Sequence, residues 1–371
     1  MKSFLLLLAI VLCALPLSAQ VPYNSVVPNG YTRKAIVSEQ VGFTQVTITY
    51  HRPAVKGRDG KVWGELVPKG FVDQGFGNGK PTPWRAGANE NTVIEFDNDV
   101  KIEGQVLPKG KYGLFLAFDP AESTLIFSKR SDAWGSFYYD EKEDALRVKV
   151  KPQPVEKSVE YLKYEFTDPT PNSALVVVSW EKLAVPFKVE VDLLKQQFEA
   201  FVTESQNPRG WTSEGLNIAA NWTLQNNYQL DKGLEWATTA TRAGFPGNPN
   251  SFPALATKAG ILDKLGRADE AAAVMKTAMP LGSMVELQQF GRQLLAAKKP
   301  QAALEVFQFN YTKNPDQFTT LVGMARGLSA NGQYTKALEF ATKALPKAPN
   351  EPNKQAVAAM IEKLKAGKDV N

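Results

Sequence analysis

The segment from Trp84 to Thr92 gathers side chains that are suited to bind or convert a polar ligand. Arg85 carries a planar fork of donors that fits a carboxylate or a phosphate, Asn89 can donate and accept, and Glu90 can act as a base. Two small residues between Arg85 and Asn89, Gly87 and Ala88, let backbone N–H groups approach a ligand. The segment is therefore the first candidate site, for a small polar molecule or a glycan.

Two further arginines, Arg52 and Arg58, precede this segment on a connection that contains Pro and Gly, and they could converge with it. The alternative is structural: the arginines and Glu90, which could pair with Arg85, would form ion pairs that tie long loops to the domain. We favour the structural alternative, because perturbed charged groups are often structural and need not be functional.

A cluster of aromatic residues is the second candidate. Trp134, Phe137, Tyr138 and Tyr139 precede an acidic run over residues 140–144. Exposed rings beside carboxylates suit stacking on a sugar or a peptide, whereas the alternative is packing in the core or at its rim. The acidic run lacks the spacing of an EF-hand, which predicts a solvated turn. The candidate ligand-binding residues are Arg52, Arg58, Trp84, Arg85, Asn89, Glu90, Trp134 and Tyr139.

The scarcity of nucleophiles and metal ligands limits the chemistry. The chain has one histidine, His51, and its one cysteine, Cys13, lies in the expected export signal, so after cleavage the chain cannot form a His/Cys zinc site or a Cys–His catalytic pair. It has no phosphate loop of Gly-Lys-Ser/Thr type, and the run Gly75–Gly79 lacks the flanking strand and helix of one. We predict no catalytic residue, no metal and no cofactor, and we expect His51 to lie in a strand at the edge of a sheet.

The first 19 residues have the pattern of a secretory signal. Lys2 gives a positive start, Phe4–Leu15 is apolar, and cleavage is expected after Ala19. The apolar run is too short to span a bilayer, and Cys13 lacks the preceding small residue of a lipidation signal. We predict an exported protein of the periplasm, cell envelope or extracellular space, without a membrane segment after cleavage. The net charge of +5 is scattered, which argues against nucleic-acid binding.

Residues 24–192 have the period of β-strands. β-branched and aromatic residues alternate with polar ones, and turn residues such as Pro108-Lys109-Gly110 and Asp119-Pro120 separate the runs. This pattern predicts an antiparallel β-sandwich or barrel-like domain. Typical runs are Val46–Tyr50, Thr92–Phe96, Tyr112–Phe118, Ser123–Phe127, Leu146–Val150, Ala174–Trp180 and Pro186–Val191.

Several motifs in this half resemble a known family. They are Tyr50-His51-Arg52-Pro53, Gly64-Glu65-Leu66-Val67-Pro68, Trp84-Arg85-Ala86-Gly87-Ala88-Asn89-Glu90-Asn91-Thr92, Leu107–Phe115, Ala133-Trp134-Gly135 and Ser179-Trp180-Glu181. From about residue 38 to 192 the chain resembles domain-of-unknown-function family 2911, which occurs in exported proteins of Bacteroidetes-like bacteria. The resemblance implies no particular activity. Two departures are His51, where the family has a small polar residue, and an insertion over 71–83, which we expect to be a flexible loop.

Residues 193–371 have the period of helical hairpins. Three segments align, and their final alanines, Ala271, Ala303 and Ala337, lie 32 and 34 residues apart. This frame resembles the tetratricopeptide repeat family, in which small residues allow close helix packing. A weaker hairpin is expected around 216–243 and a capping helix over 352–365. The alternative is an irregular helical bundle with accidental periodicity.

Three functions are compatible with these features. The first is a non-catalytic binding or scaffold protein whose helical repeats present a concave surface to a protein or peptide partner, and we favour it because the chain lacks catalytic groups. The second is an envelope hydrolase or glycan-binding module with a pocket near Arg85, Asn89 and Glu90. The third is a purely structural β domain.

Overall fold

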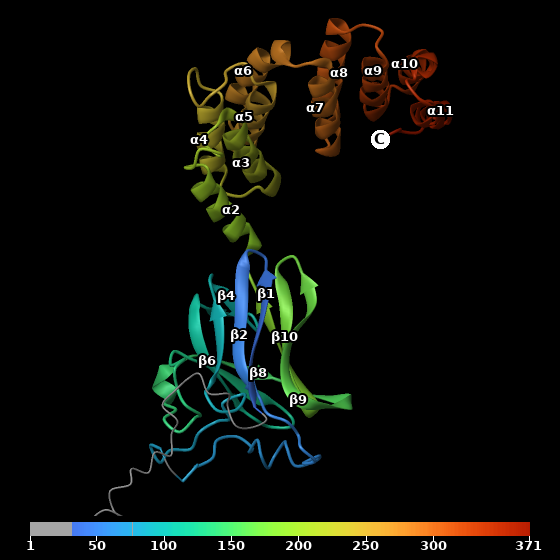
Figure 1. Ribbon diagram of the computed structural model, residues 1–371. Coiled ribbons are helices and arrows are strands. Elements are labelled where there is room, and N and C mark those ends of the chain that lie inside the picture. Colours follow the sequence, from blue (N-terminus) through green and yellow to red (C-terminus); the bar gives the residue numbers. More distant parts are fainter. Residues whose placement is uncertain (1–31, 76) are drawn as a thin grey trace, which may run out of the picture. The chain divides into compact units, whose positions relative to one another are not determined.

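The computed structural model describes residues 32–75 and 77–371 and divides into two compact units (Figure 1). The first ends at Gln196, and the second comprises Gln197–Asn371. We expected the second domain to begin at residue 193; α2 (Leu193–Glu204) begins there, and the division falls within this helix. The predicted export signal, with Cys13, lies outside the described residues.

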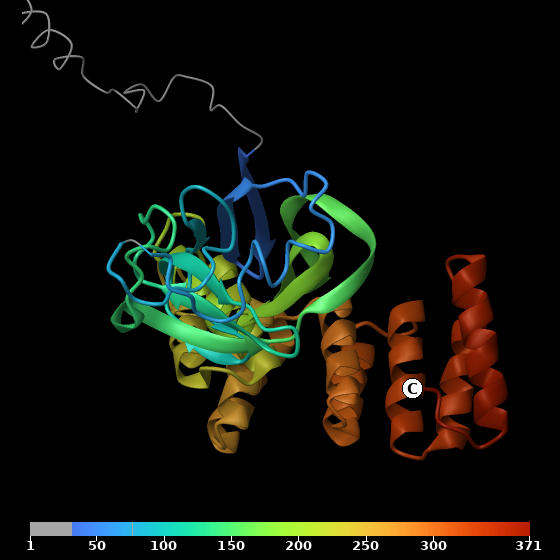
Figure 2. The ribbon, with the colours of Figure 1, turned by 90° about the horizontal axis from the view of Figure 1, so that it is seen from below.

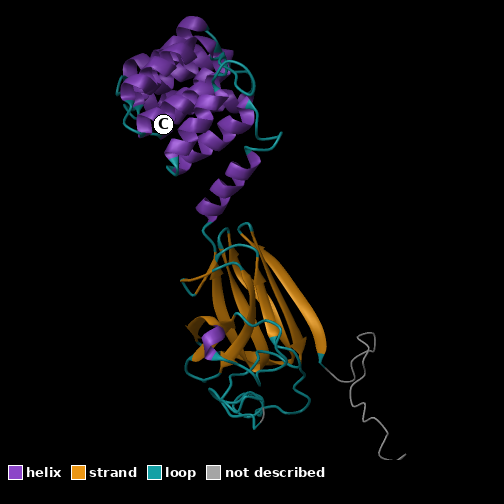
Figure 3. Ribbon diagram, turned by 90° about the vertical axis from the view of Figure 1, so that its left-hand side faces the viewer, coloured by secondary structure: helices purple, strands orange, loops and turns teal. Residues whose placement is uncertain are grey.

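The first unit consists of two antiparallel sheets (Figure 3). The six-stranded sheet has the order β1 (Arg33–Val41), β2 (Thr44–Arg52), β3 (Thr92–Phe96), β6 (Gly110–Ala117), β7 (Ser123–Ser128), β8 (Asp144–Val150). The four-stranded sheet has the order β5 (Gln105–Leu107), β4 (Val100–Ile102), β10 (Ser173–Glu190), β9 (Gln153–Thr170). The predicted antiparallel β class is confirmed, with an open sandwich of two sheets.

The alternation of apolar and polar residues places the core between the sheets. In β2, Val46, Ile48 and Tyr50 are buried, while the residues between them are more exposed. Phe127 of β7 meets Phe187 of β10 edge to face, with ring centroids 6.0 Å apart. Because these two strands belong to different sheets, this contact shows that the inner faces pack against each other.

The second unit is a series of helical hairpins (Figures 1 and 2). The hairpins are α3 (Ser213–Asn226) with α4 (Leu230–Ala240), α5 (Phe252–Lys264) with α6 (Ala268–Ala278), α7 (Met284–Ala296) with α8 (Pro300–Lys313), and α9 (Phe318–Ala330) with α10 (Tyr334–Ala344). They are followed by α11 (Glu351–Lys365). The predicted helical-hairpin array is confirmed, and the region with the weaker pattern also forms a hairpin.

The local sequence explains where these helices end and begin. Gly266 and Gly332 adopt positive φ angles in the turns between paired helices, a conformation that favours glycine. Pro300 occupies the first turn of α8, where its missing N–H leaves no helical hydrogen bond unmade. The frame alanines Ala271, Ala303 and Ala337 are buried, as expected for residues at which two helices approach closely.

Phe307 of α8 is the largest side chain at the centre of the later hairpins, and it is fully buried. Three glycines make room for its ring. A Cβ atom would lie 2.4 Å from the Phe307 ring at Gly291 of α7, and 2.8 Å from it at Gly323 and Gly327 of α9. One aromatic ring therefore holds three helices together, because the facing positions lack side chains.

Aromatic rings join the second part of α2 to the first hairpin. Phe198 lies 5.7 Å from Trp236 of α4, and Phe201 lies 5.5 Å from Trp222 of α3, between ring centroids. Since both phenylalanines belong to the second unit, this part of α2 covers the apolar face of the first hairpin.

Candidate functional site

The candidate residues of the β unit do not form one cluster. Glu90 lies beside His51, with 3.1 Å between its Oε2 and the imidazole Nδ1. The Glu90 side chain is exposed, whereas His51 is buried. Burial lowers the pKa of His51, while the Glu90 carboxylate opposes this change and Lys34 adds to it. The expected ion pair between Glu90 and Arg85 is wrong, because the Glu90 carboxylate contacts His51 instead.

His51 lies in an inner strand of the six-stranded sheet. We expected it at a sheet edge, but β2 is the second strand, and His51 pairs with Lys34 of β1. The pairing of β2 with β3 ends at Thr49, so the segment over residues 85–91 covers His51 instead of a strand. A Cβ at Gly87 would lie 3.4 Å from the backbone oxygen of His51. The sequence showed the motif around His51 and the motif around Glu90, but it did not show that these two residues contact each other.

Arg85 is half-buried and has no partner for its Nε among the described residues. Burial lowers the pKa of its guanidinium. Its backbone oxygen accepts a hydrogen bond from the Thr92 N–H at 3.3 Å, which closes the loop between them. Ala86 and Asn89 both adopt positive φ, of 53° and 57°. Two such non-glycine residues in one short loop mean that surrounding contacts hold it in a strained conformation.

Arg52 and Arg58 bind backbone oxygens. The Arg52 Nε donates to Leu162 O at 3.0 Å, and its guanidinium lies 5.9 Å from the centre of the Tyr161 ring. The Arg58 Nε and Nη2 donate to Val55 O and Ala54 O. No hydrogen bond or ion pair between described residues joins either arginine to the loop that carries Arg85, so the expected convergence is not present in the contacts of the structure.

Trp84 and Asn89 have different environments. Trp84 is buried, its indole N–H donates to Gly87 O at 3.1 Å, and its ring stacks on Trp180 at 6.1 Å. Asn89 donates through Nδ2 to the Thr32 hydroxyl at 3.1 Å. Trp84 thus packs in the core of the sandwich, while Asn89 ties its loop to Thr32, which directly precedes β1.

Trp134 is the candidate that the structure places next to Glu90. Their backbones form an antiparallel bridge, flanked by hydrogen bonds from Asn91 N to Ala133 O and from Gly135 N to Asn89 O. Trp134 is 61% exposed, so its ring is open to solvent. Its backbone lies beside that of Glu90, which pairs with His51.

Tyr139 belongs to a separate network. Its hydroxyl donates to Asp144 Oδ2 at 2.7 Å and accepts from Arg147 Nη2 at 2.8 Å, while its ring packs on Phe115. Burial raises the pKa of Asp144, although its bonds to Tyr139 and Arg147 oppose this rise. The insertion over residues 71–83 reaches this network, because Asn78 Nδ2 donates to Tyr139 O at 3.0 Å and Phe71 lies against the Tyr139 ring.

The acidic run near residue 140 forms a short 3-10 helix, Glu141–Glu143, whose start Asp140 caps by accepting from Lys142 N. Over residues 32–75 and 77–371, no group of three or more His, Cys, Asp or Glu side chains is arranged to hold a metal ion. No helix in the same ranges is both long and apolar enough to cross a membrane.

The helical unit contains a larger groove of about 730 Å³, which sequence reasoning did not place. It is lined by α3, α5 and α7, the first helices of successive hairpins, and by neighbouring residues. The lining residues are Asn217, Asn221, Leu224, Gln225, Phe252, Pro253, Ala256, Thr257, Gly260, Asp263, Lys264, Glu286, Gln289, Phe290, Gln293, Leu294, Ala297 and Lys299.

Side-chain amides dominate two walls of this groove. Asn217, Asn221 and Gln225 follow one another four residues apart on α3, and Gln289 and Gln293 do so on α7. None of these five amides makes a hydrogen bond to another described residue, and the Asn217 Oδ1 is buried without a partner. Ala256 and Gly260 of α5 lie between the walls, and Leu224 packs directly on α5, because a Cβ at Gly260 would lie 2.7 Å from its Cδ2. Lys299 and Asp263 form an ion pair at the groove.

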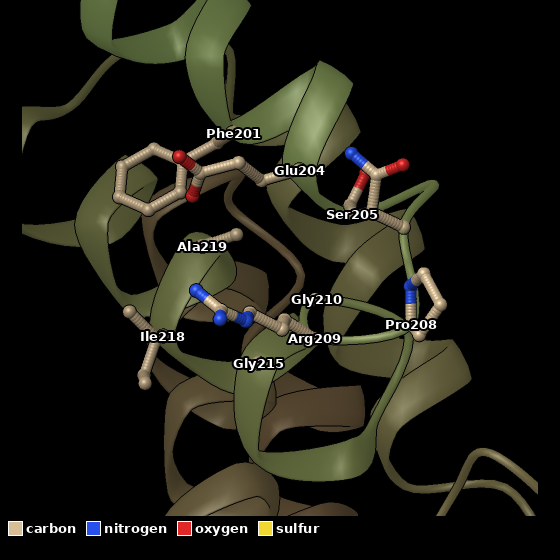
Figure 4. A pocket seen from close by; sticks show the side chains of 10 residues that line it. Phe201, Glu204, Ser205, Pro208, Arg209, Gly210, Gly215, Ile218 and Ala219 are labelled. Carbon is tan, nitrogen blue, oxygen red and sulfur yellow. The ribbon is translucent and has the colours of Figure 1, made fainter.

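A second cavity, of about 640 Å³, lies where α2 ends and α3 begins (Figure 4). Phe201, Ile218 and Ala219 give it an apolar wall, and Glu204 and Arg209 supply charges of opposite sign. Nothing in the periodicity of the sequence pointed to this loop, since it lies before the first repeat and has no motif.

Comparison with known proteins agrees with the order of the two halves. Residues 32–189 match the family described as a protein of unknown function (DUF2911), and residues 294–361 match a tetratricopeptide repeat. The resemblances inferred from the sequence are thus confirmed, in the expected order. No curated protein matches the chain significantly.

Solved structures similar to this chain are tetratricopeptide repeat proteins. TTC0263 of Thermus thermophilus is 16% identical, with 46% of this chain and 91% of that one covered and a TM-score of 0.31. YrrB, described as a TPR protein with an unusual peptide-binding site, is 16% identical over 47% of this chain and 87% of its own, with a TM-score of 0.27. MamA of Desulfovibrio magneticus is 16% identical over 42% and 93%, with a TM-score of 0.26.

Proposed function

We propose that this chain is an exported scaffold protein whose helical repeats bind an extended segment of a partner polypeptide in the groove of α3, α5 and α7. The observation that carries the proposal is the set of five uncommitted amides on two helices of the groove, above all Asn217, whose buried Oδ1 lacks a donor. A buried acceptor without a donor is unfavourable, and a peptide N–H would satisfy it.

The chemistry of the groove favours a polypeptide backbone over a compact ligand. An amide side chain can donate and accept at once, which matches the alternating N–H and C=O groups of an extended chain. On α5, the small and only partly buried Ala256 lines the groove between the two walls. Phe290 and Leu294, which are only partly buried, supply apolar surface for a partner side chain.

The proposal is tested by selecting peptides from a displayed random library on the full chain and measuring their affinity for variants. Asn217→Ala should weaken binding of the selected peptides by about tenfold, because one hydrogen bond in a desolvated site is lost. Gln293→Ala should act in the same direction from the wall formed by α7. The measurement is fluorescence anisotropy of the labelled peptides.

The matched control is Gln308→Ala. Gln308 is an exposed amide on α8 that does not line the groove and makes no side-chain hydrogen bond to a described residue. Selected peptides should bind this variant as they bind the unaltered chain. Equal affinity for all three variants and the unaltered chain would contradict the groove as the binding site.

Export is the second part of the proposal, and it rests on the sequence pattern of the first 19 residues. Expression of the whole coding sequence in a Gram-negative host should yield periplasmic protein that begins at Gln20, as read by mass spectrometry of the N-terminal peptide. Protein that stays in the cytoplasm and retains residues 1–19 would exclude export.

A second candidate function is favoured by Trp134. Its exposed ring lies on the strand-like segment that pairs with Glu90, an arrangement that suits stacking on a sugar ring with a carboxylate beside it. Soluble oligosaccharides should then quench tryptophan fluorescence in the unaltered chain but not in Trp134→Ala. Identical titration curves for both proteins would rule out this glycan site.

A further inference from the structure

The cavity at the start of the helical array has a composition that differs from that of the groove. It lies between the end of α2, the connection over residues 205–212, and α3. Its lining residues are Phe201, Glu204, Ser205, Asn207, Pro208, Arg209, Gly210, Gly215, Ile218 and Ala219. With a volume of about 640 Å³ it falls within the range of small-molecule sites.

Two opposite charges meet an apolar wall in this cavity. Figure 4 shows the Glu204 carboxylate beside the Phe201 ring and the Arg209 guanidinium beside Ile218. Ile218 of α3 lines the cavity and is 54% exposed, so its side chain is not covered by the rest of the chain. Neither Glu204 nor Arg209 forms an ion pair or a side-chain hydrogen bond with another described residue. Both charged groups are therefore available to a ligand.

The connection that carries Arg209 is held in place by its own backbone. Asn207 O accepts from the N–H groups of Gly210 and Trp211, at 3.0 and 2.8 Å, and Asn207 N donates to Glu204 O at 2.9 Å. At Gly210, a Cβ atom would lie only 2.2 Å from Glu204 O, so the connection packs directly on the end of α2. A wall that is ordered before binding loses little conformational entropy on binding.

We propose that this cavity binds a small zwitterion with an apolar side chain, such as a free amino acid of the phenylalanine or leucine type. Arg209 would bind its carboxylate, Glu204 its ammonium group, and Phe201 and Ile218 its side chain. A simple anion or cation would leave one of the two charges unused, and glycine would leave the apolar wall uncovered. The site is distinct from the peptide groove and does not depend on it.

Isothermal titration calorimetry on the full chain tests this proposal with three probes. L-Phenylalanine should bind, while N-acetyl-L-phenylalanine, which lacks the ammonium group, and L-phenylalanine amide, which lacks the carboxylate, should each bind about tenfold more weakly. Absence of binding by L-phenylalanine and L-leucine at millimolar concentrations, or equal binding of all three phenylalanine probes, would overturn the proposal.

Variants locate the site. Arg209→Gln and Glu204→Gln should each weaken L-phenylalanine binding by about tenfold, because each removes one charge-assisted contact. The controls Arg292→Gln and Glu214→Gln change exposed residues that do not line the cavity, and Asn217→Ala changes the groove. All three controls should bind L-phenylalanine like the unaltered chain. If Arg209→Gln and Glu204→Gln keep full affinity, the cavity is not the binding site.

Discussion

At the scale of single residues, His51 is the group whose environment the sequence did not reveal. It is buried in the β unit against the segment over 85–91, and the exposed carboxylate of Glu90 lies on its Nδ1. Burial favours the neutral imidazole, whereas Glu90 favours the charged form, and burial has the larger effect. In the contact between His51 and Glu90, desolvation and the carboxylate charge therefore act on the His51 pKa in opposite directions.

We predict that His51 titrates below the ordinary histidine pKa of about 6.5. Because the chain has a single histidine, its Cε1–H resonance in ¹H NMR gives this pKa without assignment. Glu90→Gln should lower the pKa further, since the carboxylate that favours the charged form is removed. A measured pKa at or above 6.5 would show that the Glu90 charge outweighs burial, and a rise in Glu90→Gln would contradict the stabilising effect of the carboxylate on the charged imidazole.

The same shift predicts a dependence of stability on pH. A depressed pKa means that the unfolded chain binds a proton at His51 more readily than the folded one, so the free energy of unfolding falls as pH drops through about 6.5. His51→Gln should remove this contribution. Thermal melts between about pH 7 and about pH 5 should show a smaller loss of Tm in the variant, and equal losses would contradict the shift.

For single residues, the sequence predicts positions only where a periodic pattern exists. The aromatic and arginine candidates were found by residue type, yet Arg52, Arg58 and Trp84 proved to be bound to backbone oxygens. Loops have no period, so residue types alone could not show which loop residues meet. Glu90 and Trp134 are neighbours through a backbone bridge between segments more than forty positions apart, which no local pattern encodes.

At the scale of elements, the repeat frame was predictable because close helix packing leaves a trace in the sequence. Ala303 and Ala337 are fully buried at helix crossings, and a residue with positive φ, Lys298 or Gly332, precedes each in the turn. The socket of Phe307 was not predictable in the same way. Its three glycines belong to two different helices, and only their approach to one ring reveals their common role.

We predict that Gly291→Ala destabilises the helical unit by about 1–3 kcal/mol, because the new methyl group would overlap the Phe307 ring. Phe307→Ala should cost about 3–5 kcal/mol through loss of buried surface and the cavity left behind. Urea denaturation followed by far-ultraviolet circular dichroism measures both.

The double variant Gly291→Ala with Phe307→Leu separates overpacking from a general intolerance of helix substitutions. The smaller side chain should relieve the overlap, so the double variant should be less destabilised than the sum of the single variants Gly291→Ala and Phe307→Leu. Strict additivity would mean that Gly291 matters for a reason other than the Phe307 ring.

At the scale of the whole molecule, each unit has its own buried core. The sandwich core includes Ile48, Trp180 and Phe187, whereas separate clusters in the repeats centre on Trp236, Leu287 and Phe307. A unit with its own core and its own set of long-range contacts is expected to unfold as its own cooperative transition.

This expectation gives a prediction that uses one substitution in each core. Ile48→Ala should lower the melting temperature of a transition seen in the β signal of circular dichroism, while Phe307→Ala should lower that of a helical transition, each leaving the other within a few degrees of its original value. Differential scanning calorimetry of the full chain resolves the two heat-absorption peaks. The exposed substitution Gln308→Ala serves as the control and should move neither peak. If either core substitution shifts both transitions together, the two units fold as one, and the groove and the β loops would have to be treated as parts of a single cooperative structure.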